Sequence, residues 1–120
     1  MESRNLNVSF NKSGSGSITP KLCLPITWLK EMDINQEDKG IIVSLFDDSI
    51  VIRKAGVESN FRKDVIDERD KNISFNKSGS GSITTRIVLP ITYTKHLSIS
   101  EDNRAVIVNF KNNMITIKKA

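Results

Sequence analysis

Cationic side chains beside two identical Gly/Ser loops are the residues of this chain best suited to chemistry. The ten residues FNKSGSGSIT at 10–19 recur unchanged at 75–84. Glycine lets backbone approach an anion closely, and serine hydroxyls and backbone N–H groups donate hydrogen bonds to phosphate oxygens. The pattern predicts a surface that faces nucleic acid, with these candidates: Lys12, Ser13, Ser15, Lys77, Ser78 and Ser80.

Four further cations occupy equivalent positions in two parts of the chain. Lys21 and Arg86 lie on an expected strand before a proline, where an arginine can read guanine in a bidentate way. Lys30 and Lys95 lie on an expected short helix and are expected to contact phosphate rather than a base. Asn11 and its counterpart Asn76 fit either an adenine contact or a turn cap.

Catalytic and metal chemistry finds little support in the sequence. The single Cys23 is replaced by Val88 at the equivalent position, and His96 has no cysteine or second histidine to share a metal. Asp47-Asp48 corresponds to Asn112-Asn113, which favours a turn over paired carboxylates. We therefore expect no enzyme activity, no cofactor and no metal site. Trp28, which is Tyr93 in the second copy, could stack on bases, but its spacing favours packing.

Composition limits the remaining possibilities. The chain has 120 residues, a net charge of +4 and one cysteine, so it has no internal disulfide. No apolar run approaches the length of a membrane span, and we expect a cytoplasmic protein without membrane contact. Residues 7–55 have no net charge, whereas residues 72–120 carry +5, which favours a polyanionic partner.

An ungapped internal repeat organises the chain. An offset of 65 residues aligns 7–55 with 72–120, and 24 of the 49 pairs are identical, 12 of them within the first 13 positions. The sequence therefore predicts repeat 1 at 7–55, a helical bridging segment at 56–71 and repeat 2 at 72–120. Units this small bury little surface alone, so the two repeats are expected to share one core.

Each repeat is expected to contain two strands, a short helix and a β-hairpin. In repeat 1, alternation predicts strands in LNVSF and SITPKLCLP, and Pro25 suits the first turn of a helix. The β-branched runs GIIVSLF and SIVIRK form the expected hairpin, and Asn112-Asn113 suits a tight turn in the second copy.

The segments SITPKLCLPITWLKEMDINQEDKGIIVSLFDDSIVIRK and SITTRIVLPITYTKHLSISEDNRAVIVNFKNNMITIKK resemble the AbrB/MazE/SpoVT swapped-hairpin DNA-binding domain family. The resemblance implies a mostly β fold with short helices, in which the two repeats form one intramolecular swapped-hairpin β-barrel, a pseudo-dimer. It also implies basic contact residues on the pre-proline strand, the helix and the N-terminal loop.

Two functions from different classes follow from these features. The first is a sequence-specific double-stranded DNA-binding protein that acts as a bacterial transcriptional regulator on an imperfectly palindromic operator, with most of the affinity from repeat 2. The alternative is an antitoxin component of a toxin–antitoxin pair, or a protein–protein oligomerisation module with weak DNA binding. Its partner would be a toxin or a second copy of the chain, and the zero net charge of repeat 1 favours it.

Overall fold

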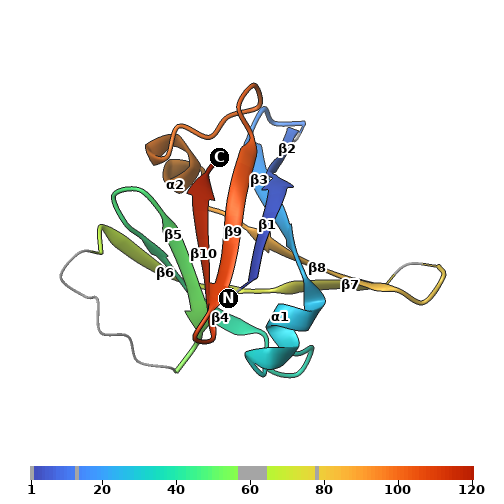
Figure 1. Ribbon diagram of the computed structural model, residues 1–120. Helices are drawn as coiled ribbons and strands as arrows, with labels where there is room; N and C mark the ends of the chain where they lie inside the picture. The colour runs from blue at the N-terminus through green and yellow to red at the C-terminus, as the bar shows by residue number, and fades with distance from the viewer. Residues whose placement is uncertain (1, 13, 57–64, 78) are drawn as a thin grey trace.

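The same series of elements occurs twice along the chain. The structure is a computed structural model that describes residues 2–12, 14–56, 65–77 and 79–120 (Figure 1). The first series comprises β1 (Glu2–Asn7), β2 (Ser9–Lys12), β3 (Ile18–Leu24), α1 (Ile26–Glu31), β4 (Gly40–Leu45) and β5 (Ile50–Lys54). The second comprises β6 (Asp67–Asn72), β7 (Ser74–Lys77), β8 (Ile83–Val88), α2 (Ile91–His96), β9 (Ala105–Lys111) and β10 (Met114–Lys119). The 65-residue offset also relates β1 to β6, so the structural repeat extends five residues further upstream than the predicted boundary at residue 7.

Proline starts each helix and a left-handed residue ends it. Pro25 and Pro90 are the N-cap residues, with φ of −61° and −60°. Past each C-cap, Asp33 and Ser98 adopt positive φ of 59° and 62°. Ile34 N then donates to the carbonyl of Leu29 at 2.9 Å, and the second copy repeats this arrangement. These are the hydrogen bonds of a Schellman motif, which satisfies carbonyls that the end of a helix leaves unpaired.

The predicted hairpins are confirmed, and their turns differ. Asn112 and Asn113 have φ of 53° and 59°, and Lys111 pairs with Met114 across them. Positive φ at both central residues is the geometry of a type I′ turn, which matches the twist of the flanking strands. The equivalent turn in repeat 1 is closed by a hydrogen bond from Phe46 N to the Ser49 carbonyl.

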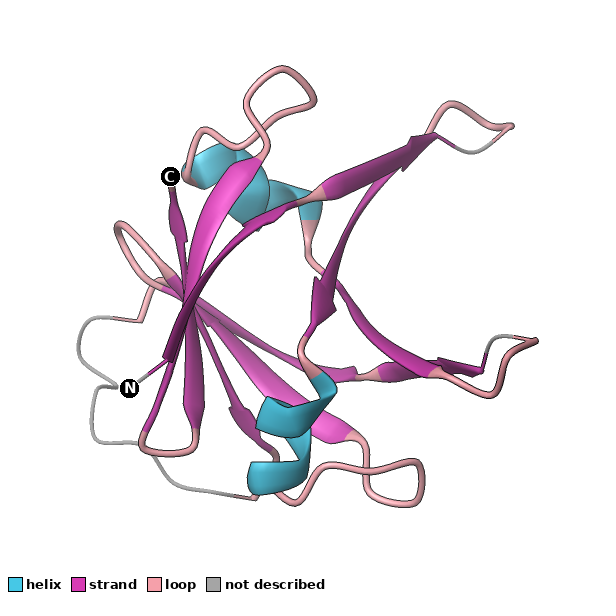
Figure 2. Ribbon diagram, turned by 45° about the vertical axis from the view of Figure 1, so that its right-hand side comes forward, coloured by secondary structure: helices cyan, strands magenta, loops and turns pink. Residues whose placement is uncertain are grey.

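The strands form two antiparallel sheets. A six-stranded sheet has the order β1-β9-β10-β5-β4-β6, and a four-stranded sheet has the order β2-β3-β8-β7. In Figure 2 the β2–β3 and β7–β8 hairpins project from the body as two arms. The strand that begins each repeat pairs with the other repeat: β1 lies along β9, and β6 lies along β4.

The expected intramolecular swapped-hairpin β-barrel is wrong. In the described part of the chain the two sheets do not close on each other, because β1 and β6 are the edges of one sheet and β2 and β7 the edges of the other. The chain passes from the six-stranded to the four-stranded sheet at Val8, the buried residue that links β1 to β2 in the sequence. It leaves the four-stranded sheet at Pro25. Hairpins are not exchanged either, since β4–β5 and β9–β10 lie side by side in one sheet through β5 and β10. The exchanged element is the single leading strand.

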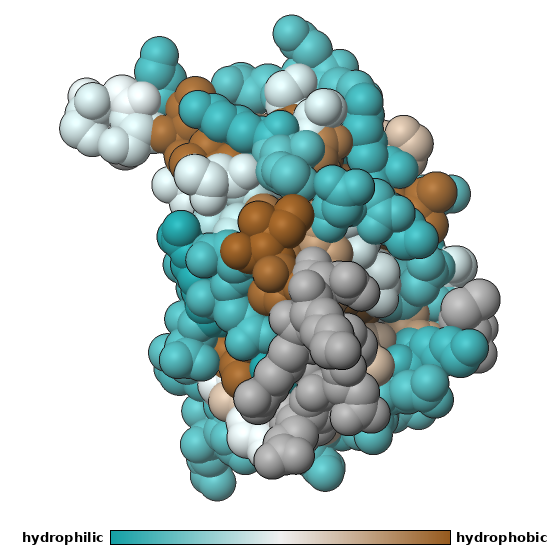
Figure 3. All heavy atoms as spheres, turned by 90° about the vertical axis from the view of Figure 1, so that its left-hand side faces the viewer, coloured by the Kyte–Doolittle hydropathy of each residue, from teal (hydrophilic) through white to brown (hydrophobic). Residues whose placement is uncertain are grey.

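One hydrophobic core serves both repeats, as the sequence predicts. Its cluster includes residues of each helix and each hairpin, among them Trp28, Ile52, Tyr93 and Ile117. Among the described residues on the face drawn in Figure 3, hydrophilic ones predominate, and hydrophobic residues form a patch near the centre and smaller patches at the upper left and the right edge.

Local structure departs from the sequence-based expectation at LNVSF and at the end of the bridging segment. The single strand expected at LNVSF is divided at Val8 into the end of β1 and the start of β2. The helix expected in the bridging segment lies largely outside the described residues, at 57–64, and its end at 67–70 belongs to strand β6.

Candidate nucleic-acid interface

The four-stranded sheet carries positive charge without negative charge. Its strands contain Lys12, Lys21, Lys77 and Arg86, and they contain no aspartate or glutamate. The Gly/Ser loops that join the strands of each arm add no acidic residue either. Each repeat supplies two of the four cations. The difference in net charge between the repeats therefore arises outside this sheet.

A pseudo-two-fold axis passes through the centre of this sheet. Leu22 pairs directly with Ile87, and these two residues occupy the same position in the two repeats. Both side chains are buried, with exposed fractions of 1% and 0%. They anchor the inner face of the sheet to the core. The neighbouring residues on each strand point away from the core, because successive side chains alternate between faces.

The residues that share the face of Lys21 and Arg86 are called the outer face here. Register and alternation place the following on it: Ser9, Asn11, Thr19, Lys21, Cys23, Ser74, Asn76, Thr84, Arg86 and Val88. Lys21 pairs with Val88, and Arg86 pairs with Cys23, so the two cations are diagonal neighbours across the axis. Such neighbours lie roughly 7–8 Å apart in an antiparallel sheet.

A polar hollow lies at this centre. It has a volume of about 260 Å³ and is lined by Ser9, Asn11, Lys21, Cys23 and Arg86. Arg86 and Cys23 are exposed, and Lys21 is half-buried. Two cations therefore border a depression whose other lining groups include a hydroxyl and a carboxamide, which is chemistry suited to phosphates and base edges.

Lys12 and Lys77 point to the other side of the arms. Lys12 pairs with Ile18 and Lys77 with Ile83, on the face that bears Leu22 and Ile87 nearer the axis. Both lysines are exposed, because each lies where its arm extends past the core. The structure therefore brings Lys21 and Arg86 together and places Lys12 and Lys77 at the arm ends, beside the Gly/Ser loops.

The Gly/Ser loops combine one constrained glycine with one unconstrained glycine. Gly16 and Gly81 have φ of 90° and 91°, a conformation that other residues adopt with strain. Gly14 and Gly79 do not have positive φ, and a Cβ built on either would meet no atom within 4 Å. Turn geometry explains the first pair and leaves the second unexplained. Ser15 and Ser80 lie exposed in these loops, with their Oγ atoms 3.4 Å from Ser17 Oγ and Ser82 Oγ respectively. Ser13 and Ser78 fall outside the described residues.

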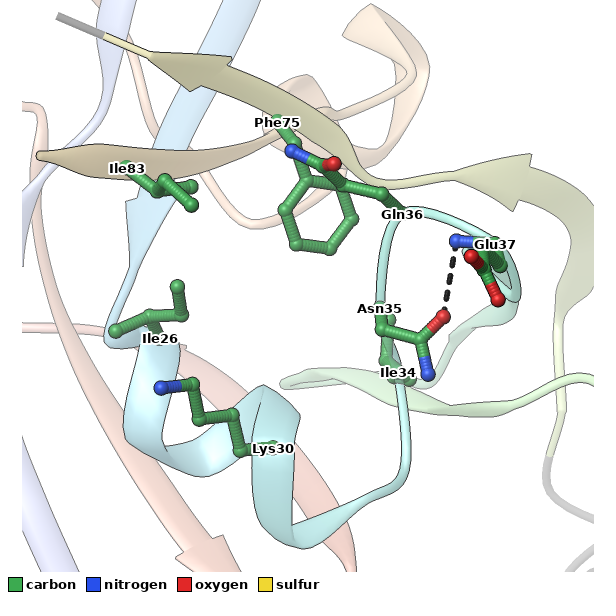
Figure 4. A pocket seen from close by; sticks show the side chains of 8 residues that line it. All are labelled: Ile26, Lys30, Ile34, Asn35, Gln36, Glu37, Phe75 and Ile83. Atoms are coloured by element: carbon green, nitrogen blue, oxygen red, sulfur yellow. Dashed lines mark hydrogen bonds between the residues drawn. The ribbon is translucent and has the colours of Figure 1, made fainter. Parts of the chain in front are cut away.

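Lys30 and Lys95 are exposed on the two helices. Lys30 lines a groove of about 340 Å³ between α1, the loop after it and the β7–β8 arm. Figure 4 shows its side chain facing this groove, whose other lining residues are Ile26, Ile34, Asn35, Gln36, Glu37, Phe75 and Ile83. Phe75 and Ile83 belong to the inner side of the arm, so Lys30 lies behind the outer face and beside an arm of the other repeat.

An acid–aromatic–arginine cluster in each repeat was missed by sequence reasoning. Trp28 Nε1 donates to Glu2 Oε2 at 2.5 Å, and Tyr93 OH donates to Asp67 Oδ2 at 2.7 Å. The guanidinium of Arg4 lies 5.7 Å from the Trp28 ring centroid, and Arg69 lies 5.6 Å from that of Tyr93. Extending the 65-residue alignment upstream of residue 7 pairs Glu2 with Asp67 and Arg4 with Arg69, and this signal would have revealed the clusters.

The cluster of the second repeat shifts the pKa values of Asp67 and Tyr93. The hydrogen bond from Tyr93 and the contact with Arg69 lower the pKa of Asp67 below its usual value of 3.8. Burial, reinforced by the carboxylate of Asp67, raises the pKa of Tyr93. Trp28 and Tyr93 are both buried, and Trp28 stacks on Phe110 with centroids 5.5 Å apart. These rings act in packing, as the favoured interpretation of their spacing predicts.

Metal-ligating groups do not cluster in the described residues. No helix in the described part of the chain is long and apolar enough to cross a membrane. Comparisons with protein-family models, with curated proteins and with solved structures find no match for this chain.

Proposed function

We propose that the chain is a double-stranded DNA-binding protein that regulates transcription by occupying an operator. The observation that carries the proposal is the four-stranded sheet with four cations and no acidic residue, whose Lys21 and Arg86 meet at a pseudo-two-fold axis. Such a surface attracts the phosphate backbone, and its symmetry resembles that of duplex DNA, whose two strands are also related by two-fold axes.

Dimensions support the central strands as the elements that enter a groove. Adjacent strands lie about 4.8 Å apart, so four strands span about 14 Å, whereas the major groove is about 12 Å wide and admits a two-stranded ribbon. On this basis β3 and β8 carry Lys21 and Arg86 to base edges. Ser9, Asn11 and their counterparts on β2 and β7 then meet the backbone at the groove walls.

The arms extend the contact along the backbone. Lys12, Lys77 and the Gly/Ser loops lie at the ends of the arms, where flexible lysine side chains and loop N–H groups reach phosphates outside the central groove. Lys30 and Lys95 lie behind the face and serve as secondary phosphate contacts at most.

Titrating salt against binding to a mixed-sequence duplex tests the proposal. Fluorescence anisotropy between 50 and 200 mM salt should give a log–log slope of about −4, since each neutralised phosphate contributes about −0.9. Lys21→Ala with Arg86→Ala should weaken binding to this duplex and change the slope from about −4 to about −2, because two of the four neutralising cations are lost.

The matched control removes the same charge elsewhere. Lys39 and Arg104 are equivalent exposed cations outside the four-stranded sheet, and their double alanine variant should lose far less affinity. Circular dichroism should be unchanged in both variants. Absence of binding at 50 mM salt, or equal losses in the two variants, would refute the proposal. In the first case the oligomerisation alternative would take its place.

A further inference from the structure

The outer face differs between the repeats at two positions, and both lie at the axis. Three of its pairs are identical: Ser9 with Ser74, Asn11 with Asn76, and Thr19 with Thr84. The other two are Lys21 with Arg86 and Cys23 with Val88. In the described strands, divergence on this face is therefore confined to the four residues around the Leu22–Ile87 pair.

We propose that this arrangement makes the protein read an operator with palindromic flanks and an asymmetric centre, in which Arg86 selects a guanine on one side of the axis. The inference rests on the proposed DNA-binding function and specifies the sequence that the site recognises. It replaces the expectation that the halves differ through their overall charge, because each repeat contributes two cations to this sheet.

Arginine and lysine at equivalent positions are not interchangeable readers. The guanidinium presents two parallel donors in a fixed plane, which match O6 and N7 of guanine, whereas the lysine ammonium is a single point charge on a flexible stem. Each cation also has a different cross-strand neighbour: Cys23 lies opposite Arg86, and the branched Val88 lies opposite Lys21. The two sides of the centre thus present different donors and different shapes to the base pairs that they meet.

The base pairs that flank the centre should be recognised alike in both halves, because the side chains that meet them are identical in the two repeats. Thr19 and Thr84 are identical and stand at pseudo-symmetric positions on β3 and β8, so each half should prefer the same flanking bases. The identical serines and asparagines of β2 and β7 give the two halves the same backbone contacts. Loss of the selected guanine should weaken binding about tenfold on the Arg86 side, and by a smaller factor at the symmetric position on the Lys21 side.

Selection from a randomised duplex library tests this inference with three forms of the full chain. The wild type should enrich sites with palindromic flanks and an asymmetric centre. The variant Lys21→Arg with Cys23→Val makes the outer-face residues of repeat 1 identical to those of repeat 2. It should enrich sites that are palindromic throughout, with guanine on both sides. Lys39→Arg makes the same change outside the sheet, matching Arg104, and should keep the wild-type site.

The outcomes separate this inference from the function on which it rests. A wild-type site that is palindromic to its centre, or an asymmetric centre that persists in the Lys21→Arg, Cys23→Val variant, would overturn the inference and leave DNA binding intact. If no form enriches any site and the wild type fails to bind duplex at low salt, the proposed function fails as well. The substitutions are conservative, and thermal melting should confirm that all three forms fold alike.

Discussion

Two hydrogen bonds from aromatic side chains to carboxylates attach the leading strands to the helices. Glu2 on β1 accepts from Trp28 on α1, and Asp67 on β6 accepts from Tyr93 on α2. Arg4 and Arg69 cover the same rings from the exposed side. The arrangement survives the change from tryptophan to tyrosine because each ring presents one polar donor at its edge. This conserved geometry between the copies identifies the clusters as structural.

Stability should depend on pH through Asp67. Its pKa is lower in the folded chain than the usual 3.8, so the carboxylate stabilises the fold above that pH, and this contribution is lost as the pH falls through the folded pKa. Asp67→Asn should therefore lower the urea midpoint at pH 7, and a second titration at a pH below 3.8 should show a smaller effect. Asp70→Asn, on the same strand, is the control. An Asp67→Asn effect that is equal at both pH values would contradict this assignment.

At the level of elements, the two glycines of each arm loop meet different requirements. Gly16 and Gly81 need positive φ, whereas Gly14 and Gly79 stand in open space without it. Gly16→Ala with Gly81→Ala should destabilise the arms, since each strained residue costs about 1–3 kcal/mol.

Gly14→Ala with Gly79→Ala should leave the melting temperature unchanged and weaken DNA binding, because the added methyl groups hinder close approach to phosphate. Thermal unfolding and anisotropy measure the two effects separately. Wild-type affinity in the Gly14→Ala, Gly79→Ala protein would show that the loops do not approach the backbone.

Local pattern predicted the elements better than their arrangement. Proline before each helix, β-branched hairpins and the Asn112-Asn113 turn are signals contained within a few residues, and all three are confirmed. The pairing of β1 with β9 joins residues about a hundred positions apart, such as Leu6 with Val106, and no local signal encodes it.

The candidate site was predicted in composition and not in orientation. The sequence identified the cations, but register and alternation place Lys12 and Lys21 on opposite faces of one arm. Lys12 pairs with Ile18 across the hairpin and shares its face, whereas Lys21 follows Ile18 by three positions on β3, an odd separation that puts it on the opposite face. The intervening loop hid this relation, since a loop of unknown geometry resets the alternation.

At the level of the whole molecule, the repeats depend on each other. Strand pairs β1–β9, β4–β6, β5–β10 and β3–β8 each join one repeat to the other. Each helix also contacts the other repeat: α1 packs against β8, and α2 packs against β3. In an isolated repeat 1, β1 would lose its only partner, and β3, β4 and β5 would each lose one of two partners.

Fragments 1–56 and 65–120 should consequently fold only together. We expect each alone to give a largely unstructured circular dichroism spectrum as a monomer, and an equimolar mixture to recover β structure in a one-to-one complex measured by light scattering. A fragment that remains a folded monomer on its own would contradict the shared core. Covalent linkage in the full chain supplies the high effective concentration that the fragments lack.

The direct pairing of Leu22 with Ile87 has a consequence for how such a chain can evolve. In an ancestral homodimer each side chain at that axis would face a copy of itself, so every mutation would appear twice at the same contact. Gene fusion removes this restriction: Thr85 Oγ1 donates to the Leu24 carbonyl at 2.6 Å, whereas the matching position in repeat 1 is Pro20, which has no hydroxyl. Duplication within one chain thus allows the residues on the two sides of the pseudo-two-fold axis to mutate independently.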